Sequence, residues 1–306
     1  MGKYDRTAQD MGNLIALDHL NLTVPDQQLA TLFYVEGLGF TRDPYMTVGL
    51  NNMWINAGEQ QFHLPTRETP QILRGRIGLV VPDIHELITR LIGIKPQLHT
   101  SEFEFTLHDT YVDVRDPWGN EFRCHQQGTH LGGRSIGLEY LLFNVPSGTA
   151  EGIGAFYESI LGADVVFGER RGAKSVTINS AGKRQALIFR ESESPQRQYD
   201  RHHIAIYIAD FSGPHQRLDE MGLITEESNE SQYRFDSITD LKTGNKLYDL
   251  EHEVRSMLHP MYGRALVNRN PMQSLQSYKP VSYTHLRAHE TDSYLVCPRG
   301  LEKKKG

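Results

Sequence analysis

Cysteine is scarce in this sequence, which has two among its 306 residues. Cys124 falls in a predicted strand, and Cys297 lies in a C-terminal stretch of different character. One thiol inside the expected fold cannot build a disulfide framework, so a reducing compartment, the cytoplasm, is the expected location. The residues around Cys124 include no activating neighbour, which argues against nucleophilic catalysis by this thiol.

Long apolar runs and an excess of basic residues are also missing. No stretch approaches the roughly 18 apolar residues of a membrane helix, and residues 1–14 are polar and carry acids, unlike a signal peptide. The formal net charge is −6, whereas a nucleic-acid-binding face needs clustered Lys and Arg. These absences favour a small-molecule substrate or ligand, with no nucleic-acid or membrane partner, and leave a homodimer open.

Residues 17–26, Leu-Asp-His-Leu-Asn-Leu-Thr-Val-Pro-Asp, form a pattern that the chain repeats. Residues 76–83 match its Leu, Val, Pro and Asp positions without a gap, and residues 139–146 and 203–210 are looser copies. Each copy is an apolar or β-branched run that ends in Pro or Asp, which is typical of a strand. Four such strands at quasi-regular intervals predict four structural repeats.

A helix and three more strands are expected after each of these strands. In the first repeat, Asp26 can cap a helix over residues 27–36, and three short apolar runs follow, separated by Gly, Asn and Glu. One such β-α-β-β-β module leaves an apolar sheet face exposed, so modules must pair. The predicted modules span residues 15–66, 74–128, 136–191 and 200–254, and they are expected to pair in sequence order into domains at 15–130 and 131–255.

The segments outside these modules differ in composition. Residues 1–14 are expected to form an N-terminal arm, and the turn-rich residues 128–134 a linker between the two domains. Residues 256–280 are interpreted as an extension over the surface, because three prolines prevent a long helix. Residues 281–306 have no apolar period and resemble a translated sequencing-adapter read-through, so we exclude this tail from the fold as non-native.

Several of these motifs together resemble the vicinal oxygen chelate superfamily, which includes glyoxalase I, bleomycin and fosfomycin resistance proteins, and extradiol dioxygenases. The motifs lie at residues 17–24, 33–40, 61–64 and 116–120. The resemblance implies an α+β fold of tandem βαβββ modules, paired into two cupped, barrel-like mixed β-sheet domains with helices outside. It is specific for the fold and does not fix the reaction.

The resemblance also implies where ligands for a divalent metal (Fe, Mn, Zn or Ni) would lie, on the first and last strands of each module. In the N-terminal half these positions fall at His19, His63, Arg76 and Arg123. Arginine cannot ligate a metal, because its guanidinium stays protonated and has no lone pair. Two histidines suit a metal, whereas two arginines favour an anionic ligand, and His125 shares the strand face of Arg123. The sequence leaves both interpretations open, a metal site or a metal-free cup.

The C-terminal half offers a less regular set of positions. The equivalent residues are Tyr140, Leu187, His203 and Tyr248. Because a shift of one residue exchanges the faces of a strand, Glu139, His203 and Glu251 form an alternative metal site. Tyr248 with His252 is the set on the opposite face. We interpret the basic pair Arg170 and Arg171 as solvated hairpin residues.

Two functions follow from these positions. The first is a metal-dependent enzyme, dioxygenase-, lyase- or isomerase-like, that acts on a small oxygenated anion. Its expected metal ligands are His19, His63, His203, Glu139 and Glu251, and its expected substrate-binding residues are Arg76, Arg123, His125 and Tyr248. The second is a metal-free small-molecule binding protein of the bleomycin-resistance type. A purely structural protein would instead have no cup deep enough for a ligand.

Overall fold

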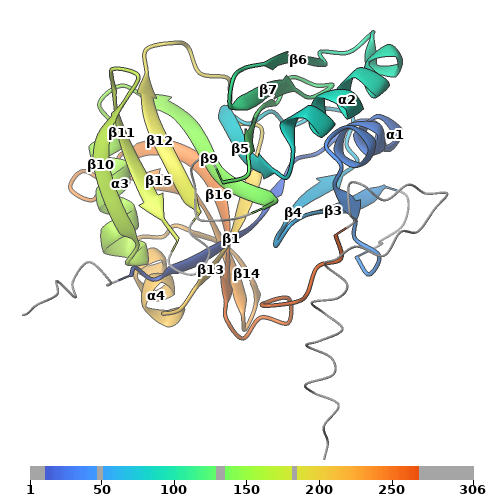
Figure 1. Cartoon of the computed structure of the whole chain (residues 1–306). Helices are drawn as coiled ribbons and strands as arrows, with labels where there is room; N and C mark the ends of the chain where they lie inside the picture. The colour runs from blue at the N-terminus through green and yellow to red at the C-terminus, as the bar shows by residue number, and fades with distance from the viewer. Residues whose placement is uncertain (1–10, 47–50, 129–134, 181–184, 269–306) are drawn as a thin grey trace, which may run out of the picture. The chain divides into compact units, whose positions relative to one another are not determined.

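The computed structural model of the chain describes residues 11–46, 51–128, 135–180 and 185–268. Within these ranges the sequence of strand, helix and three strands occurs four times (Figure 1). The first module contains β1 (Leu14–Asn21), α1 (Gln27–Ala30), its continuation η2 (Thr31–Gly37), β2 (Thr41–Arg42), β3 (Asn52–Ala57) and β4 (Gln60–Pro65). The second contains β5 (Gly75–Val81), α2 (Ile84–Ile94), η3 (Lys95–Leu98), β6 (Glu104–Leu107), β7 (Tyr111–Arg115) and β8 (Glu121–Gln126).

The third and fourth modules repeat the plan with longer strands. The third contains β9 (Gly137–Pro146), α3 (Ala150–Leu161), β10 (Asp164–Arg170), β11 (Ala173–Asn179) and β12 (Ala186–Ser192). The fourth contains β13 (His203–Ile208), α4 (Ser212–Glu220), β14 (Ile224–Asn229), β15 (Gln232–Thr239) and β16 (Lys246–Ser256). None of the helices in the described part of the chain combines the length and apolarity that crossing a membrane requires.

The modules pair into two cupped, eight-stranded mixed sheets, as the fold class predicted. The first sheet has the strand order β14-β15-β16-β13-β1-β4-β3-β2, and the second has the order β10-β11-β12-β9-β5-β8-β7-β6. The first module therefore shares a sheet with the fourth, and the second with the third. The sequence predicted that consecutive modules pair, into domains at 15–130 and 131–255. Each observed sheet instead contains one module from each of these two ranges.

Antiparallel pairing of the modules' first strands joins each sheet at its centre. In the first sheet β1 pairs with β13, and in the second β5 pairs with β9. Figure 1 shows β5 and β9 side by side, and the same for β1 and β13. All four first strands are similar apolar runs, so the pattern that identifies them does not determine which two pair.

One hydrophobic core joins the two sheets, which explains why residues up to Asn268 form a single compact unit. Phe62 of β4 and Phe122 of β8 lie with ring centroids 6.2 Å apart, and Phe33 of η2 packs 5.5 Å from Phe122. Because side chains alternate along a strand, burying Phe62 on this side places His63 on the opposite, cup-lining side of the sheet. The apolar pattern thus fixes which residues face each cup.

Local signals in the sequence place the first two helices. The Asp26 carboxylate accepts hydrogen bonds from the backbone N–H groups of Gln28 and Leu29, at 2.7 and 3.0 Å. Asp83 caps α2 in the same way, accepting from the N–H groups of His85 and Glu86 at 2.7 and 3.3 Å. Both caps satisfy N–H groups that have no partner inside the helix.

Segments at both ends of the described chain contact the sheets. The Asn13 side-chain amide donates to the carbonyl oxygens of Leu161 and Asp210 at 2.8 and 3.0 Å. At the C-terminal end, Arg264 pairs with Asp43 at 2.8 Å, so part of the predicted extension packs on the first module. Four predicted segments lie wholly or mostly outside the described residues. They are the rest of that extension, most of the linker, most of the arm, and the tail at 281–306.

Candidate functional site

Three histidines converge in the cup of the first sheet. His19 of β1, His63 of β4 and His203 of β13 each offer a ring nitrogen, and these atoms all lie within 4.8 Å of one another. The ring centroid of His19 lies 6.0 Å from that of His63 and 5.9 Å from that of His203. The sequence identified all three residues, and the pairing of the first and fourth modules brings them together.

A β-bulge orients His19. Leu17 pairs with Ile206 and His19 with Ala205, so Asp18 is an extra residue without a partner across the strand. Such a bulge redirects side chains, and here Nδ1–H of His19 donates to Oδ2 of Asp18 at 2.9 Å. In the neutral imidazole this bond puts the lone pair on the other ring nitrogen, Nε2, and that atom is buried without a hydrogen-bond partner among the described residues.

His63 is held in the complementary tautomer. Its Nε2–H donates to Oδ1 of Asn52 at 2.7 Å, so Nδ1 carries the lone pair. The Trp54 ring stacks on the imidazole with centroids 4.0 Å apart. Burial, together with nearby His19, Arg255 and Arg234, lowers the pKa of His63 to about 3. His63 is therefore neutral at physiological pH, the form that can ligate a metal.

Burial also lowers the pKa of His203 well below its ordinary value, with further contributions from His19 and Arg234. Its Nε2 is buried and has no hydrogen-bond partner within the described part of the chain. A buried polar atom left without a partner costs about 1–3 kcal/mol. A cation bound between the imidazoles would relieve this cost at both His19 and His203.

Glu253 of β16 is a carboxylate that lies beside His203. Its Oε2 lies 3.7 Å from Nε2 of His203, and the side chain is 3% exposed. Burial alone would raise the pKa of Glu253, but His19, Arg255 and Arg234 outweigh burial and lower that pKa. Glu253 is therefore a buried carboxylate beside the three imidazoles.

Two arginines link the carboxylates around the site. Arg255 contacts Asp18 at 2.9 Å and Glu253 at 2.5 Å. Arg234 pairs with Glu251 at 2.5 Å and also contacts Glu253. The Asp18 that orients His19 is thus connected through Arg255 to the Glu253 beside His203.

The donor set fits a divalent transition metal. Three imidazoles with the Glu253 carboxylate beside one of them suit Fe, Mn, Zn or Ni, and sulfur ligands are lacking among the described residues of the site. The buried, unpartnered Nε2 atoms of His19 and His203 are the structural observation that supports this fit. Asp18 binds the ring of His19 and Asn52 the ring of His63, and such hydrogen bonds fix the orientation of ligating histidines in metal sites generally.

Three residues that the sequence placed at the site lie elsewhere or act differently. Glu139 belongs to β9 of the second sheet, so it cannot join His203. Glu251 lies 3.8 Å from Nδ1 of His203, whereas Glu253 approaches Nε2, the ring nitrogen without a hydrogen-bond partner among the described residues. Tyr248 faces the core, with its ring 6.2 Å from that of Phe143, because it lies on the opposite face of β16 from Glu253.

The sequence did not identify four residues of this site. They are Glu253, Asp18, Arg234 and Arg255. The sequence predicted Tyr248 as the equivalent position in the last strand of the fourth module. The paired register places this position instead at Glu253, since Ala205 of β13 pairs with Glu253 of the long strand β16. The adjacent Asp18-His19 pair was the available signal for an oriented imidazole.

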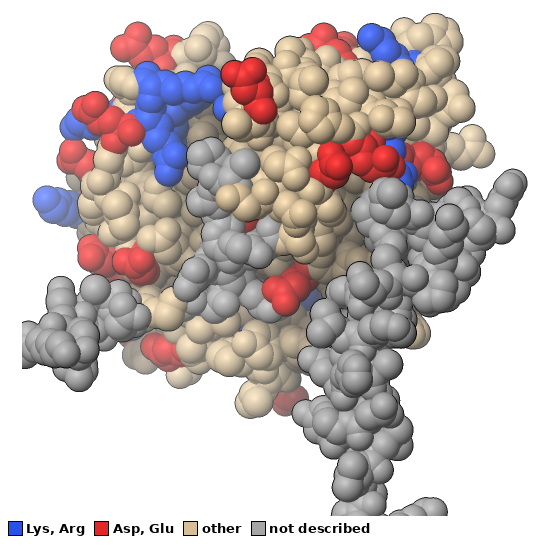
Figure 2. Space-filling view, viewed as in Figure 1, with Lys and Arg blue, Asp and Glu red and all other residues tan. Residues whose placement is uncertain are grey.

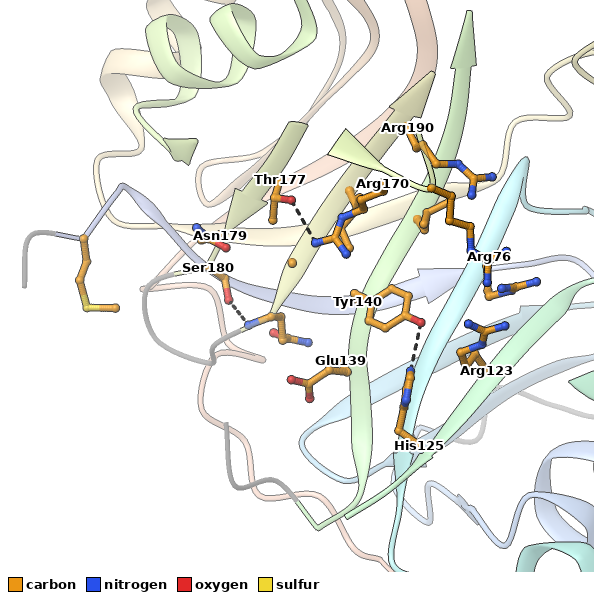
Figure 3. A pocket seen from close by; sticks show the side chains of 16 residues that line it. Arg76, Arg123, His125, Glu139, Tyr140, Arg170, Thr177, Asn179, Ser180 and Arg190 are labelled. Carbon is orange, nitrogen blue, oxygen red and sulfur yellow. Dashed lines mark hydrogen bonds between the residues drawn. The ribbon is translucent and has the colours of Figure 1, made fainter. Parts of the chain in front are cut away.

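The second sheet forms an equivalent cup from different residues. In the first sheet, Asn21 of β1 is the cross-strand partner of both His63 and His203. In the second sheet, Gly78 of β5 is likewise the cross-strand partner of Arg123 and Tyr140. Arg76, Arg123, Tyr140 and Ile188 thus stand where the first cup has His19, His63, His203 and Glu253. These four residues and His125 line a cavity of about 790 Å³ (Figure 3). The second position of the third module is therefore Ile188, and Leu187, which we predicted, faces the core.

No protein-family model matches the chain, and a search of curated proteins found no match. Solved structures are similar in fold. A "putative dioxygenase" from Bacillus subtilis matches 96% of this chain and 100% of its own, with 13% identity and a TM-score of 0.55. Glyoxalase I from Zea mays matches 78% of this chain and 92% of its own, with 15% identity and a TM-score of 0.53. The chain therefore shares the fold of these solved structures, and paired βαβββ modules of this kind are what its motifs predicted.

Proposed function

We propose that this protein is a metal-dependent enzyme of dioxygenase-, lyase- or isomerase-like type, acting on a small oxygenated molecule in the cup of the first sheet. The observation that carries the proposal is the convergence of His19, His63 and His203, with two buried ring nitrogens that have no partner among the described residues. The similar structures include proteins named glyoxalase I and "putative dioxygenase", which supports the same class of chemistry.

In this proposal His19, His63 and His203 hold a divalent metal, with Glu253 as the fourth protein ligand. The bound ion would supply Lewis acidity toward adjacent oxygen atoms of the substrate. Asp18 keeps the lone pair of His19 on Nε2, and Asn52 keeps that of His63 on Nδ1. The indole of Trp54 covers His63 and limits access of water to that imidazole.

The charge of the substrate is a separate matter from its chelating oxygens. Arg76 and Arg123 were the reason to expect an anionic substrate, and both belong to the second cup. The arginines of the first cup, Arg234 and Arg255, are already paired with Glu251, Glu253 and Asp18. The first cup therefore needs no anionic substrate, and the arginines that favour an anion line the other cup.

The metal content of the purified protein tests the proposal. Protein produced without a histidine tag is analysed for Fe, Mn, Zn and Ni by elemental mass spectrometry, before and after reconstitution with each metal. We expect one bound divalent ion per chain. If the chain stays free of metal after reconstitution, with its fold intact by circular dichroism, the enzyme proposal is wrong.

Asp18→Asn is expected to weaken the metal affinity by about 10–100-fold, the usual effect of losing a hydrogen-bond partner of a metal-ligating histidine. The amide can present its NH₂ group to Nδ1 of His19 and so favour the wrong tautomer. Competition with a metallochromic chelator measures the affinity. The matched control is Asp200→Asn, because Asp200 binds Nδ1 of His202 at 2.6 Å in the same way, and His202 is not among the converging histidines. Equal weakening in both variants would mean that Asp18 has no specific role at the metal.

A further inference from the structure

The cavity of the second cup is rich in arginine. Five arginines, Arg76, Arg123, Arg170, Arg171 and Arg190, line it, and Glu139 is the only acidic residue among the lining residues that the structure describes. Figure 3 shows the side chains of Arg76, Arg123, Arg170 and Arg190 gathered on one side of Tyr140, with the carboxylate of Glu139 directed away from them. Basic side chains also gather on the surface over strands β10 to β12 (Figure 2).

Only part of this positive charge is compensated within the described chain. Asp113 forms two hydrogen bonds with Arg123, both at 2.8 Å. Arg190 donates to the neutral Asn144 at 2.7 Å and Arg170 to the neutral Thr177 at 3.5 Å. The Nε of Arg76 is buried without a hydrogen-bond partner among the described residues.

The arginines also repel one another. The pKa of Arg190 is lowered by burial and by the charges of Arg171 and Arg76. Arg171 stands in the left-handed backbone region, with φ of 55°, in the two-residue turn between β10 and β11. A non-glycine residue in that region costs of order 1–3 kcal/mol. The turn thus holds a basic side chain at the cavity at a local conformational cost, where Asn or Gly would be favoured.

The remaining walls are partly apolar. Leu142, Ala186 and Ile188 line the same cavity as the arginines, and the ring of Tyr140 lies over Gly78, where a Cβ atom would be 2.3 Å from it. A volume of about 790 Å³ is in the range of sites that take small organic ligands. The cavity therefore combines an apolar floor with guanidinium groups suited to carboxylate or phosphate oxygens.

We propose that the cup of the second sheet is a metal-free binding site for a small organic anion, an apolar group carrying a phosphate or carboxylate, distinct from the metal centre of the first sheet. Arg76 and Arg190 bind the anionic group, and Leu142 and Ile188 contact the apolar part. The two cups thus divide the functions that the sequence left as alternatives, metal chemistry in one and anion binding in the other.

Calorimetric titration with phenyl phosphate tests this proposal, with inorganic phosphate and phenol as partial ligands. We expect saturable binding of phenyl phosphate and weaker binding of each partial ligand. Arg76→Gln and Arg190→Gln are each expected to weaken binding by about tenfold or more, since a hydrogen bond to a charged group contributes about 1.5–3 kcal/mol. The matched control is Arg197→Gln, an exposed arginine in the loop before β13 that does not line the cavity.

The metal site provides the second comparison. Phenyl phosphate binding is expected to persist in His203→Ala, and metal content is expected to persist in Arg76→Gln, so each proposal can fail without the other. Loss of binding in His203→Ala would place the anion at the metal centre and overturn the inference. Absence of saturable binding at millimolar phenyl phosphate, or equal binding by all three arginine variants and the parent protein, would overturn it as well.

Discussion

Purified His203→Ala protein is expected to contain no stoichiometric divalent metal, and His19→Ala is expected to behave in the same way. Each substitution removes a ring nitrogen from the group that lies within 4.8 Å, and the remaining ligands come from strands already fixed in the sheet. Loss of a direct ligand should exceed the about 10–100-fold loss of affinity that follows from altering the hydrogen-bond partner of a ligating histidine. Elemental analysis after reconstitution with Fe, Mn, Zn or Ni measures the effect.

The control for these variants is His85→Ala. His85 is exposed on α2, at a distance in sequence and structure from the three histidines, so the metal content of this variant should equal that of the parent chain. Circular dichroism must show the same fold in all the proteins. Full metal occupancy in both His203→Ala and His19→Ala would contradict the proposed centre, because no other group of three such ligands was found among the described residues.

The features that the sequence predicted are those that depend on neighbouring residues. Asp26 and Asp83 cap the helices that follow them, because a carboxylate at that position always has free N–H groups within reach. The side-chain alternation that buries Phe62 and turns His63 to the cup is likewise a local property of a strand. His19, His63 and His203 could be identified because each lies at a fixed place in its module.

The partner of each module is a property of the whole fold, and the sequence did not reveal it. Pairing the first module with the second would have put His19 and His63 in one cup with Arg76 and Arg123. The observed pairing separates these two sets, because β1 joins β13 and β5 joins β9. The edges of the four first strands offer the same backbone hydrogen bonds, so only packing between modules distinguishes the alternatives.

Register explains the remaining errors. β16 has 11 residues, whereas β8 has 6, and only its pairing with β13 shows that Glu253, and not Tyr248, lies beside His203. Arg170 and Arg171 are exposed residues of the β10–β11 hairpin, as the sequence predicted, and in addition both line the cavity of the second cup. Neither their sequence nor their spacing shows that the β10–β11 turn lies beside Arg76 and Arg190, since these come from strands β5 and β12.

Arg255→Met is expected to lower the free energy of unfolding by about 3–5 kcal/mol, the cost of leaving buried charges without their partner. The Arg255 side chain is 7% exposed and contacts both Asp18 and Glu253, whose carboxylates are 17% and 4% exposed. Methionine preserves much of the aliphatic packing and removes the positive charge. Urea denaturation, followed by circular dichroism, measures the change.

Neutralising the stranded acids should restore much of that loss. In the triple variant Asp18→Asn, Glu253→Gln, Arg255→Met no uncompensated charge of this group remains, and replacing a buried ion cluster by neutral residues is often nearly neutral for stability. Lys174→Met, which breaks an exposed pair with Glu151, serves as the control and should change stability little, because exposed ion pairs contribute little. If Arg255→Met is no more harmful than Lys174→Met, the Asp18–Arg255–Glu253 link does not hold the cup together. If the single variant is damaging and the triple variant is no better, Arg255 acts through its packing and not through its charge.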